Sequence, residues 1–226
     1  MDSQKALNSA QLADSMIPAD SDPYALFDAW MQAAKASEPN DPNAMALATA
    51  TPDGRPSVRM VLLKGHGPEE GANGTGRGGF TFFTNADSRK GGEIRANMYA
   101  SLLFHWKSLN RQIRIDGPLE EVTSARADAY FHSRAFMSQV GSAASDQSRP
   151  METRQDYLDR VEALRAEHEA AGQVPRPAHW TGFTLRPATI EFWMDRDNRL
   201  HDRRQFVSDG PVGEGRGGWT SSLLYP

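Results

Sequence analysis

Residues Ser57–Lys64 read Ser-Val-Arg-Met-Val-Leu-Leu-Lys, a run of aliphatic side chains with one cation near each end. An Asp-Gly turn and a proline precede the run and a glycine follows it, which predicts a buried strand entered from a β-hairpin. Burying a cation without a partner is costly. Arg59 and Lys64 therefore need anions, of which a bound phosphate is one candidate, or else their long side chains reach water or pair with carboxylates.

The composition limits the classes of protein that need to be considered. The chain has 226 residues, a formal net charge of -4 and no cysteine. The net charge argues against bulk attraction to nucleic acid or to an anionic membrane, so any anion site must be local. The lack of cysteine excludes disulfides, thiolate metal sites and cysteine nucleophiles. No apolar run resembles a signal peptide or a spanning helix near the N-terminus, which predicts a cytoplasmic protein.

The pattern along the chain predicts a mobile arm over 1–21 and a single domain over 22–226. Asp22 followed by Pro23 is typical of a helix start, and three further helices are expected over 87–97, 123–134 and 150–171. Strands are expected over 44–51, 57–64, 80–84, 99–106, 111–121, 182–185, 189–194, 199–207 and 219–225. Because strands and helices do not alternate as βαβ units, the fold class is mainly β with peripheral helices (α+β), built as an antiparallel barrel.

The segment 65–79 is rich in glycine but does not have the spacing of a phosphate-binding loop. It lacks the Gly-Lys-Ser/Thr ending, and no strand–loop–helix context surrounds it. A flexible connection within a hairpin is the better interpretation.

A stronger phosphate signal is the sequence Asp87-Ser88-Arg89-Lys90 at the expected start of a helix. The free backbone N–H groups of a first helical turn attract anions, and the helix dipole disfavours cations there. Arg89 and Lys90 are therefore misplaced unless an anion joins them, although two solvated side chains are the alternative. Together with Arg59 and Lys64, they favour a phosphate site.

The sequence Arg199-Leu200-His201-Asp202-Arg203 is the third unusual cluster. In a strand, alternation would place the arginines and the histidine on one face, which would require an anionic ligand or acidic neighbours. No spacing typical of metal ligands and no Ser/His/Asp arrangement accompanies it.

These motifs, taken together, resemble the pyridoxamine 5′-phosphate oxidase family from about Asp22 to the C-terminus. The stretches that carry the resemblance are widely separated and in order: 59–64, 83–90, 101–106, 111–112, 147–148, 175–180, 190–193 and 199–203. The resemblance implies an FMN-binding split β-barrel and a homodimer with FMN at the subunit interface. It also implies oxidation of pyridoxamine or pyridoxine 5′-phosphate to pyridoxal 5′-phosphate by hydride transfer to the flavin. Oxygen then reoxidises the flavin and gives hydrogen peroxide.

The resemblance also assigns site residues by matching position. Those implied for FMN are Arg59, Val61, Leu62, Phe83, Thr84, Arg89, Lys90, Gln112, Gln147, Ser148, Trp193 and Arg203. Those implied for the substrate phosphate are Lys64, Tyr130, Arg134 and Ser138, whereas Arg199 and His201 would face the pyridine ring as catalytic residues. Arg59 and Lys64 are an odd number of residues apart, so a regular strand would direct them to opposite faces, one toward FMN and one toward substrate.

The chain departs from the usual family pattern in three places, one of which is a longer glycine-rich segment at 65–79. After Arg134 the family usually continues with a proline-stiffened, charged loop that carries a tryptophan, whereas here 135–143 is mostly apolar. The usual arginine near the C-terminus is also absent. Two alternatives therefore remain: a split-barrel flavin oxidoreductase with another substrate, and a non-catalytic binder of FMN or pyridoxal phosphate.

Overall fold

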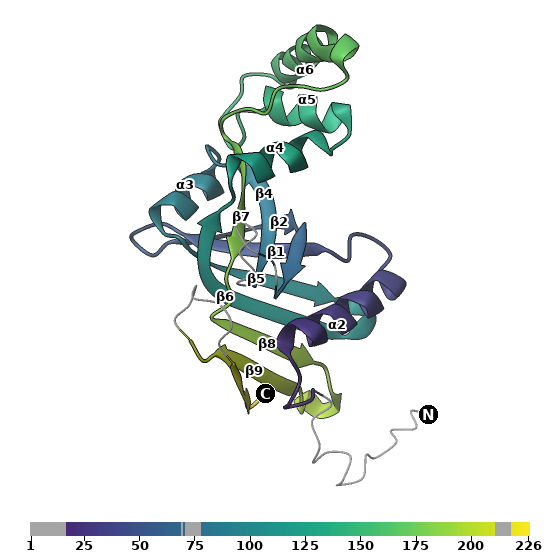
Figure 1. Ribbon diagram of the computed structural model, residues 1–226, viewed down its shortest axis with the longest axis vertical. Coiled ribbons are helices and arrows are strands. Elements are labelled where there is room, and N and C mark those ends of the chain that lie inside the picture. The colour runs from purple at the N-terminus through teal and green to yellow at the C-terminus, as the bar shows by residue number, and fades with distance from the viewer. Residues whose placement is uncertain (1–16, 69, 71–77, 211–217) are drawn as a thin grey trace.

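The protein is built around a ten-stranded antiparallel sheet that curls into two halves (Figure 1). The computed structural model describes residues 17–68, 70, 78–210 and 218–226. One half has the order β10-β9-β8-β6-β5-β1-β2, and the other joins β6 to β7, β4 and β3. The strands are β1 (Ala44–Ala50), β2 (Pro56–Leu62), β3 (Gly65–Gly67), β4 (Gly79–Asn85), β5 (Tyr99–Trp106), β6 (Arg111–Glu121), β7 (Trp180–Leu185), β8 (Thr189–Met194), β9 (Asp202–Ser208) and β10 (Trp219–Leu223). The predicted antiparallel barrel class is confirmed.

Strand β6 belongs to both halves because it is long enough to change partners. Its residues Arg111–Asp116 pair with β8, and Leu119–Glu121 pair with β7. Gly117 lies at the change. A Cβ atom there would be 1.8 Å from the carbonyl oxygen of Arg186, so only glycine lets the two backbones approach this closely.

The helices are unevenly distributed around the sheet. They are α2 (Pro23–Ser37), α3 (Arg89–Ala96), α4 (Ser124–His132), α5 (Phe136–Ala144) and α6 (Arg154–His168). Helices α4, α5 and α6 gather beyond β4 and β7, at the opposite end of the molecule from β9 (Figure 1). The barrel and the helical end each have a hydrophobic core, and α4, α5 and the start of β7 enclose the second one through Phe131, Val140, Val174 and Trp180.

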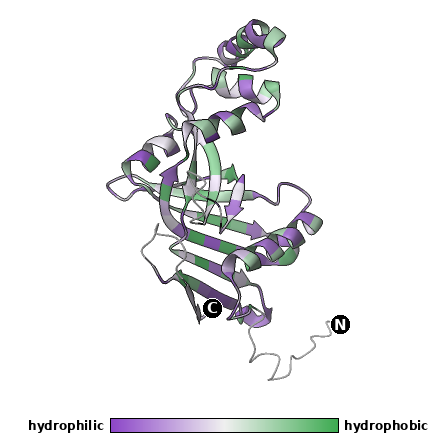
Figure 2. Cartoon of the chain, in the orientation of Figure 1, coloured by the Kyte–Doolittle hydropathy of each residue, from purple (hydrophilic) through white to green (hydrophobic). Residues whose placement is uncertain are grey.

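Helix α2 closes one face of the sheet, as its apolar periodicity predicts. Asp22 caps the helix by accepting bonds from the backbone of Tyr24 and Ala25, and Pro23 occupies the first turn. Phe27 contacts Phe80 and Phe104 edge to face, with ring centroids 5.0 and 5.3 Å apart. Hydrophilic and hydrophobic residues alternate along several strands (Figure 2), and the buried apolar residues of the strands share one core with those of α2.

The prediction that Ser57–Lys64 forms a buried strand is wrong in two respects. Strand β2 ends at Leu62, and it is an edge strand whose alternate side chains are exposed. Val58 is 68% exposed and Met60 is 62% exposed. The exposed apolar side chains of this stretch therefore form part of the surface of the subunit.

Three predicted boundaries also differ from the structure. Ile17 is buried and its carbonyl accepts a bond of 2.8 Å from Arg204, so the packed part of the chain begins by Ile17 instead of Asp22. Residues 1–16 of the predicted arm lie outside the described residues, as do 69 and 71–77 of the glycine-rich segment. Helix α6 begins at Arg154 and has no buried residue. Strand β9 begins at Asp202, so Arg199 and His201 precede it.

Candidate active site

A cavity of about 1080 Å³ opens between the edge strand β2, the start of α3 and the helices α4 and α5. Its lining includes most of the side chains that the sequence singles out: Arg59, Val61, Leu62, Lys64, Phe83, Thr84, Arg89, Lys90, Tyr130, Arg134, Ser138, Gln147 and Ser148. These residues come from segments up to ninety positions apart in the chain, and the fold brings them to one space. Their proximity is a finding of the structure, whereas their roles stay predictions.

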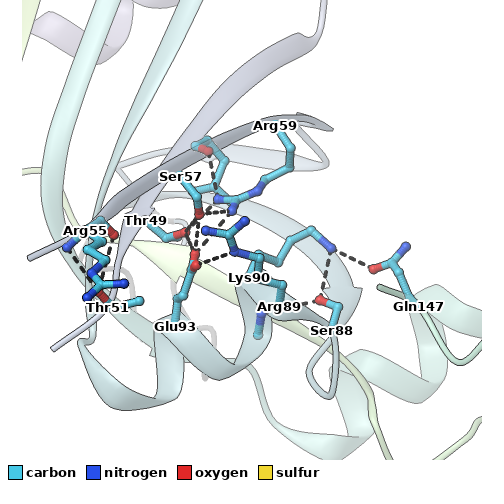
Figure 3. A network of polar contacts seen from close by, with 12 residues as sticks. Thr49, Thr51, Arg55, Ser57, Arg59, Ser88, Arg89, Lys90, Glu93 and Gln147 are labelled. Atoms are coloured by element: carbon cyan, nitrogen blue, oxygen red, sulfur yellow. Dashed lines mark hydrogen bonds and ion pairs between the residues drawn. The ribbon is translucent and has the colours of Figure 1, made fainter. Parts of the chain in front are cut away.

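The first group of cations in the cavity surrounds the N-terminus of α3. Ser88 caps this helix by accepting a bond from the backbone N–H of Gly91. The Lys90 ammonium donates to Ser88 at 3.0 Å and to the Gln147 side chain at 2.6 Å (Figure 3). Arg59 reaches the same region from β2 and donates to the carbonyl of Leu47 at 3.0 Å. The predicted cluster of donors at this helix start is therefore present.

The surroundings of Lys90 disfavour the charged form of its side chain. Burial, and to a smaller extent the charge of Arg59, lower the pKa of Lys90 from 10.5 to about 8. An anion beside Lys90 would favour the charged ammonium and raise its pKa again. A phosphate group, which is a dianion at neutral pH, fits this donor set in charge and in number of hydrogen bonds.

A second cationic group lies at the helical end of the cavity. The Lys64 ammonium is 5.9 Å from the centre of the Tyr130 ring, and the Arg134 guanidinium is 5.2 Å from that of Trp180. Phe83 stacks on both rings, with centroids 4.1 Å from Tyr130 and 5.3 Å from Trp180, and the Tyr130 and Trp180 rings are 6.0 Å apart. One terminal nitrogen of Arg134, Nη1, is buried and has no hydrogen-bond partner among the described residues. This group has the charge to bind a second anion.

Arg59 and Lys64 line the same cavity, although strand parity predicts opposite faces. The reason is that β2 ends at Leu62, so the alternation does not extend to Lys64. The backbone N–H of Lys64 instead donates to Thr81 of β4, which turns the chain toward the second half of the barrel.

The remaining predicted residues lie elsewhere, on the outer face of the sheet. Gln112 pairs with Trp193, which pairs with Arg203, so the three side chains form one row across β6, β8 and β9. Strands β2 and β8 are four strand spacings apart in the sheet, about 19 Å at ~4.8 Å per spacing. A single subunit therefore does not bring this row to the main cavity.

Arg199 and His201 line a smaller cavity of about 430 Å³ beside that row, together with Trp193, His105 and Asn110. The chain turns sharply here, and Asn198 and Arg199 have φ values of 56° and 62°. Arg199 and His201 share this cavity because of the turn and not because of strand alternation, so the predicted reason was wrong. His201 lies against Trp193, with ring centroids 4.7 Å apart, and its Nδ1 is 2.9 Å from a carboxylate oxygen of Asp195.

Sequence reasoning missed the buried acid beneath the first cationic group. Glu93 on α3 accepts bonds from Arg89 and Thr49 and contacts Arg59. Its position four residues after Arg89 was the available signal, because such residues lie on the same face of a helix. Asn85, which also lines the cavity and bonds the carbonyl of Ser145, was missed as well.

Two negative findings apply to the described residues only. Over 17–68, 70, 78–210 and 218–226, no group of three or more His, Cys, Asp or Glu side chains could hold a metal ion. In the same part of the chain, no helix has both the length and the apolar character needed to cross a membrane.

Comparison with known proteins gives consistent matches over the whole chain. A family model described as pyridoxamine 5′-phosphate oxidase matches residues 31–193, and one described as the pyridoxine 5′-phosphate oxidase C-terminal dimerisation region matches 180–226. The pyridoxine/pyridoxamine 5′-phosphate oxidase of Novosphingobium aromaticivorans is 60% identical over 97% of this chain and 100% of its own length. That of Erythrobacter litoralis is 62% identical over 95% of each chain.

Solved structures show the same fold. PhzG from Burkholderia lata, in complex with tetrahydrophenazine-1-carboxylic acid, matches with a TM-score of 0.79 and 30% identity, covering 93% of this chain and 95% of its own. A pyridoxamine 5′-phosphate oxidase-related, FMN-binding protein from Nostoc punctiforme has a TM-score of 0.68 at 15% identity over 91% of this chain and 99% of its own. The second likeness concerns the fold alone.

Proposed function

The chain belongs to the pyridoxamine 5′-phosphate oxidase family, and on that premise we propose that it is an FMN-dependent pyridoxine/pyridoxamine 5′-phosphate oxidase. Its product would be pyridoxal 5′-phosphate. The observation that carries this proposal is the pair of cationic groups in one cavity. FMN and the substrate each bring one phosphate, and the cavity offers one group of donors for each.

The residues around the first group fit the FMN phosphate. Arg59, Arg89 and Lys90 supply the charge, and the free N–H groups at the start of α3 supply further donors. The lowered pKa of Lys90 agrees with a site that is completed by an anion. When bound, FMN supplies the hydride acceptor and passes the electrons to oxygen, which yields hydrogen peroxide.

The second group fits the substrate phosphate. Lys64 and Arg134 would bind it together with the hydroxyls of Tyr130 and Ser138, which line the same part of the cavity. The buried, unpartnered Nη1 of Arg134 would then gain an acceptor, which removes the cost of leaving a buried donor unsatisfied. The stacked rings of Phe83, Tyr130 and Trp180 fix the direction of both cations.

We propose that a second subunit completes the site, so that the enzyme is a homodimer with FMN at the interface. The C-terminal part of the chain matches the dimerisation region of the family. The exposed Val58 and Met60 on β2 lie on the same outer face as the row formed by Gln112, Trp193 and Arg203. A partner laid on this face would bring its own row, with Arg199 and His201, toward the main cavity.

Arg199 and His201 would then act on the substrate ring. A planar guanidinium against the pyridine favours electron-rich states of the ring, and an imidazole can orient the substrate or hold a proton. Asp195, next to Nδ1 of His201, would fix the orientation of the imidazole.

The test is formation of pyridoxal 5′-phosphate by the FMN-loaded protein supplied with pyridoxamine 5′-phosphate in air. We expect the product and hydrogen peroxide in equal amounts. Arg199→Ala should lower turnover about a hundredfold and leave the protein yellow, because the side chain acts on the substrate ring. Arg55→Ala, which removes an exposed arginine from the hairpin turn, is the matched control and should keep full turnover. A yellow wild-type protein that makes no product would indicate a flavin enzyme with another substrate.

A further inference from the structure

Glu93 is a buried carboxylate directly beneath the cations of the first group (Figure 3). Its side chain is 5% exposed, although it carries a charge and lies on α3, a helix whose start faces the cavity. Glu93 does not line the cavity, so it would not touch a ligand bound there. Buried charges are retained when they are paired and hydrogen-bonded, and Glu93 is both.

The two carboxylate oxygens of Glu93 hold two different arginines. Oε1 accepts from Arg89 Nε at 2.9 Å, and Oε2 lies 3.2 Å from Arg59 Nη2. Oε2 also accepts from the hydroxyls of Thr49 and Ser57, each at 2.5 Å. One acid thus connects an arginine of β2 to an arginine of α3.

Glu93 stays ionised throughout the working pH range. Burial by itself would raise the pKa of Glu93, but the hydrogen bonds from Ser57, Thr49, Arg89 and Arg59 outweigh it and lower the pKa to about 2. The charge is needed because Arg59, Arg89 and Lys90 repel one another before any ligand binds.

We propose that Glu93 is a positioning residue that holds Arg59 and Arg89 in the geometry that binds the FMN phosphate. The Arg89 side chain is 66% exposed. Glu93 binds its Nε, and no contact among the described residues engages its Nη atoms, so these atoms are available to a ligand. Without Glu93, Arg59 would keep only its neutral acceptors on Leu47, Thr49 and Ser57, and the ligand would have to immobilise the long Arg89 side chain, which reduces affinity. This inference rests on the proposed function, because it assumes that the anion is the phosphate of FMN.

The test compares two flavins, FMN and riboflavin, which differ by that phosphate. The apo-protein is titrated with each flavin and the quenching of flavin fluorescence gives the dissociation constant. A positioning role predicts that Glu93→Gln weakens FMN binding about tenfold or more and leaves riboflavin binding unchanged. Long-range electrostatics alone predicts the opposite sign, because removing a negative charge near a phosphate would strengthen FMN binding.

Two further variants keep the test decisive if Glu93→Gln folds poorly. Thr49→Val keeps every charge and nearly the same shape but removes a hydroxyl that donates to Glu93 and accepts from Arg59, and it should weaken FMN binding a few-fold. Glu120→Gln is the control, because Glu120 pairs with the buried Arg186 in another part of the barrel. It should lower the thermal midpoint without changing the ratio of FMN to riboflavin affinity.

The results distinguish a failure of the proposed function from a failure of the positioning role of Glu93 alone. If the wild-type protein does not prefer FMN over riboflavin, the proposed function fails and the inference with it. If the wild type does prefer FMN, and Glu93→Gln and Thr49→Val keep that preference unchanged, the positioning role alone is wrong. Equal losses of both flavins in these variants would also overturn it, because they would show a general loss of structure.

Discussion

The charged side chains of the main cavity are fixed by neighbours of three kinds. Arg59 and Arg89 are held by the buried carboxylate of Glu93, and Lys90 by the side chains of Ser88 and Gln147. Arg134 instead lies over aromatic rings. The three arginines stay protonated, whereas Lys90 can lose its charge because its pKa is lowered to about 8.

Lys90 should make FMN binding depend on pH. Its pKa of about 8 in the free protein lies below the ordinary 10.5, and a bound phosphate would raise it again. Above pH 8, FMN binding must therefore take up a proton. We expect the dissociation constant of FMN to rise between pH 8 and 9.5, by up to about tenfold per pH unit. Fluorescence titration of the apo-protein across this range measures it.

Lys90→Arg is the control for this pH effect. The guanidinium keeps its charge, so the dissociation constant of FMN should be flat over the same range. The titration of Lys90 does not itself destabilise the apo-protein over this range. The unfolded chain holds the Lys90 proton more tightly than the folded one, so for this group the stability of the apo-protein increases as pH rises through 8. A wild-type dissociation constant that does not change with pH would contradict the assigned role of Lys90.

Residue types and spacing could predict the cations of the site but not their environment. Arg59, Arg89 and Lys90 are visible as cations near a strand end and a helix start. Whether a cation meets water, a carboxylate or a cavity depends on contacts between distant segments, such as Thr49 with Glu93. The assignment of Gln112 and Trp193 to the same cofactor came only through the family, because no local pattern relates them to the main cavity.

At the level of elements, most strands could be predicted because their alternation is regular. The bounds of β5, β6 and β8 agree with the predicted ones. Errors occurred where tertiary structure overrides the pattern. The alternate apolar side chains of β2 lie on the surface and not in the core. Arg199 lies in a tight turn, where the two-residue alternation of a strand does not apply. The atypical segment 135–143 forms most of α5, whose Val140 packs into the second core.

The long strand β6 offers a test of how the two halves of the barrel are joined. Gly117→Ala would place a methyl group 1.8 Å from the carbonyl oxygen of Arg186, and neither backbone can move without disturbing its sheet. We expect a loss of about 1–3 kcal/mol in the free energy of unfolding. Chemical denaturation followed by tryptophan fluorescence measures this change.

Gly92→Ala is the matched control for Gly117→Ala. Gly92 lies within α3, and a Cβ atom there would meet nothing within 4 Å. Alanine should therefore stabilise the protein by about 0.5–1 kcal/mol through helix propensity. If Gly117→Ala were equally harmless, the close approach of β6 to the connection between β7 and β8 would not be a constraint on the fold.

At the scale of the whole molecule, the residues of the proposed active site fall into two sets that one subunit keeps apart. The main cavity opens at the edge strand β2, and Arg199 and His201 lie in a separate cavity four strands away near β8. Val58 and Met60, two apolar side chains on the outer face of β2, are exposed in the single subunit. A second copy of the chain would both cover these side chains and bring the two sets together.

Met60→Asp tests this arrangement. Met60 is 62% exposed in the single subunit, so a carboxylate there would be desolvated by a partner that covers this face. We expect the variant to sediment as a monomer, to bind FMN at least about tenfold more weakly, and to lose oxidase activity, while its circular dichroism stays native. Met151→Asp, which changes a methionine of 61% exposure just before α6, should leave the dimer and its activity intact. A Met60→Asp protein that stays dimeric and fully loaded with FMN would show that the partner does not cover the outer face of β2.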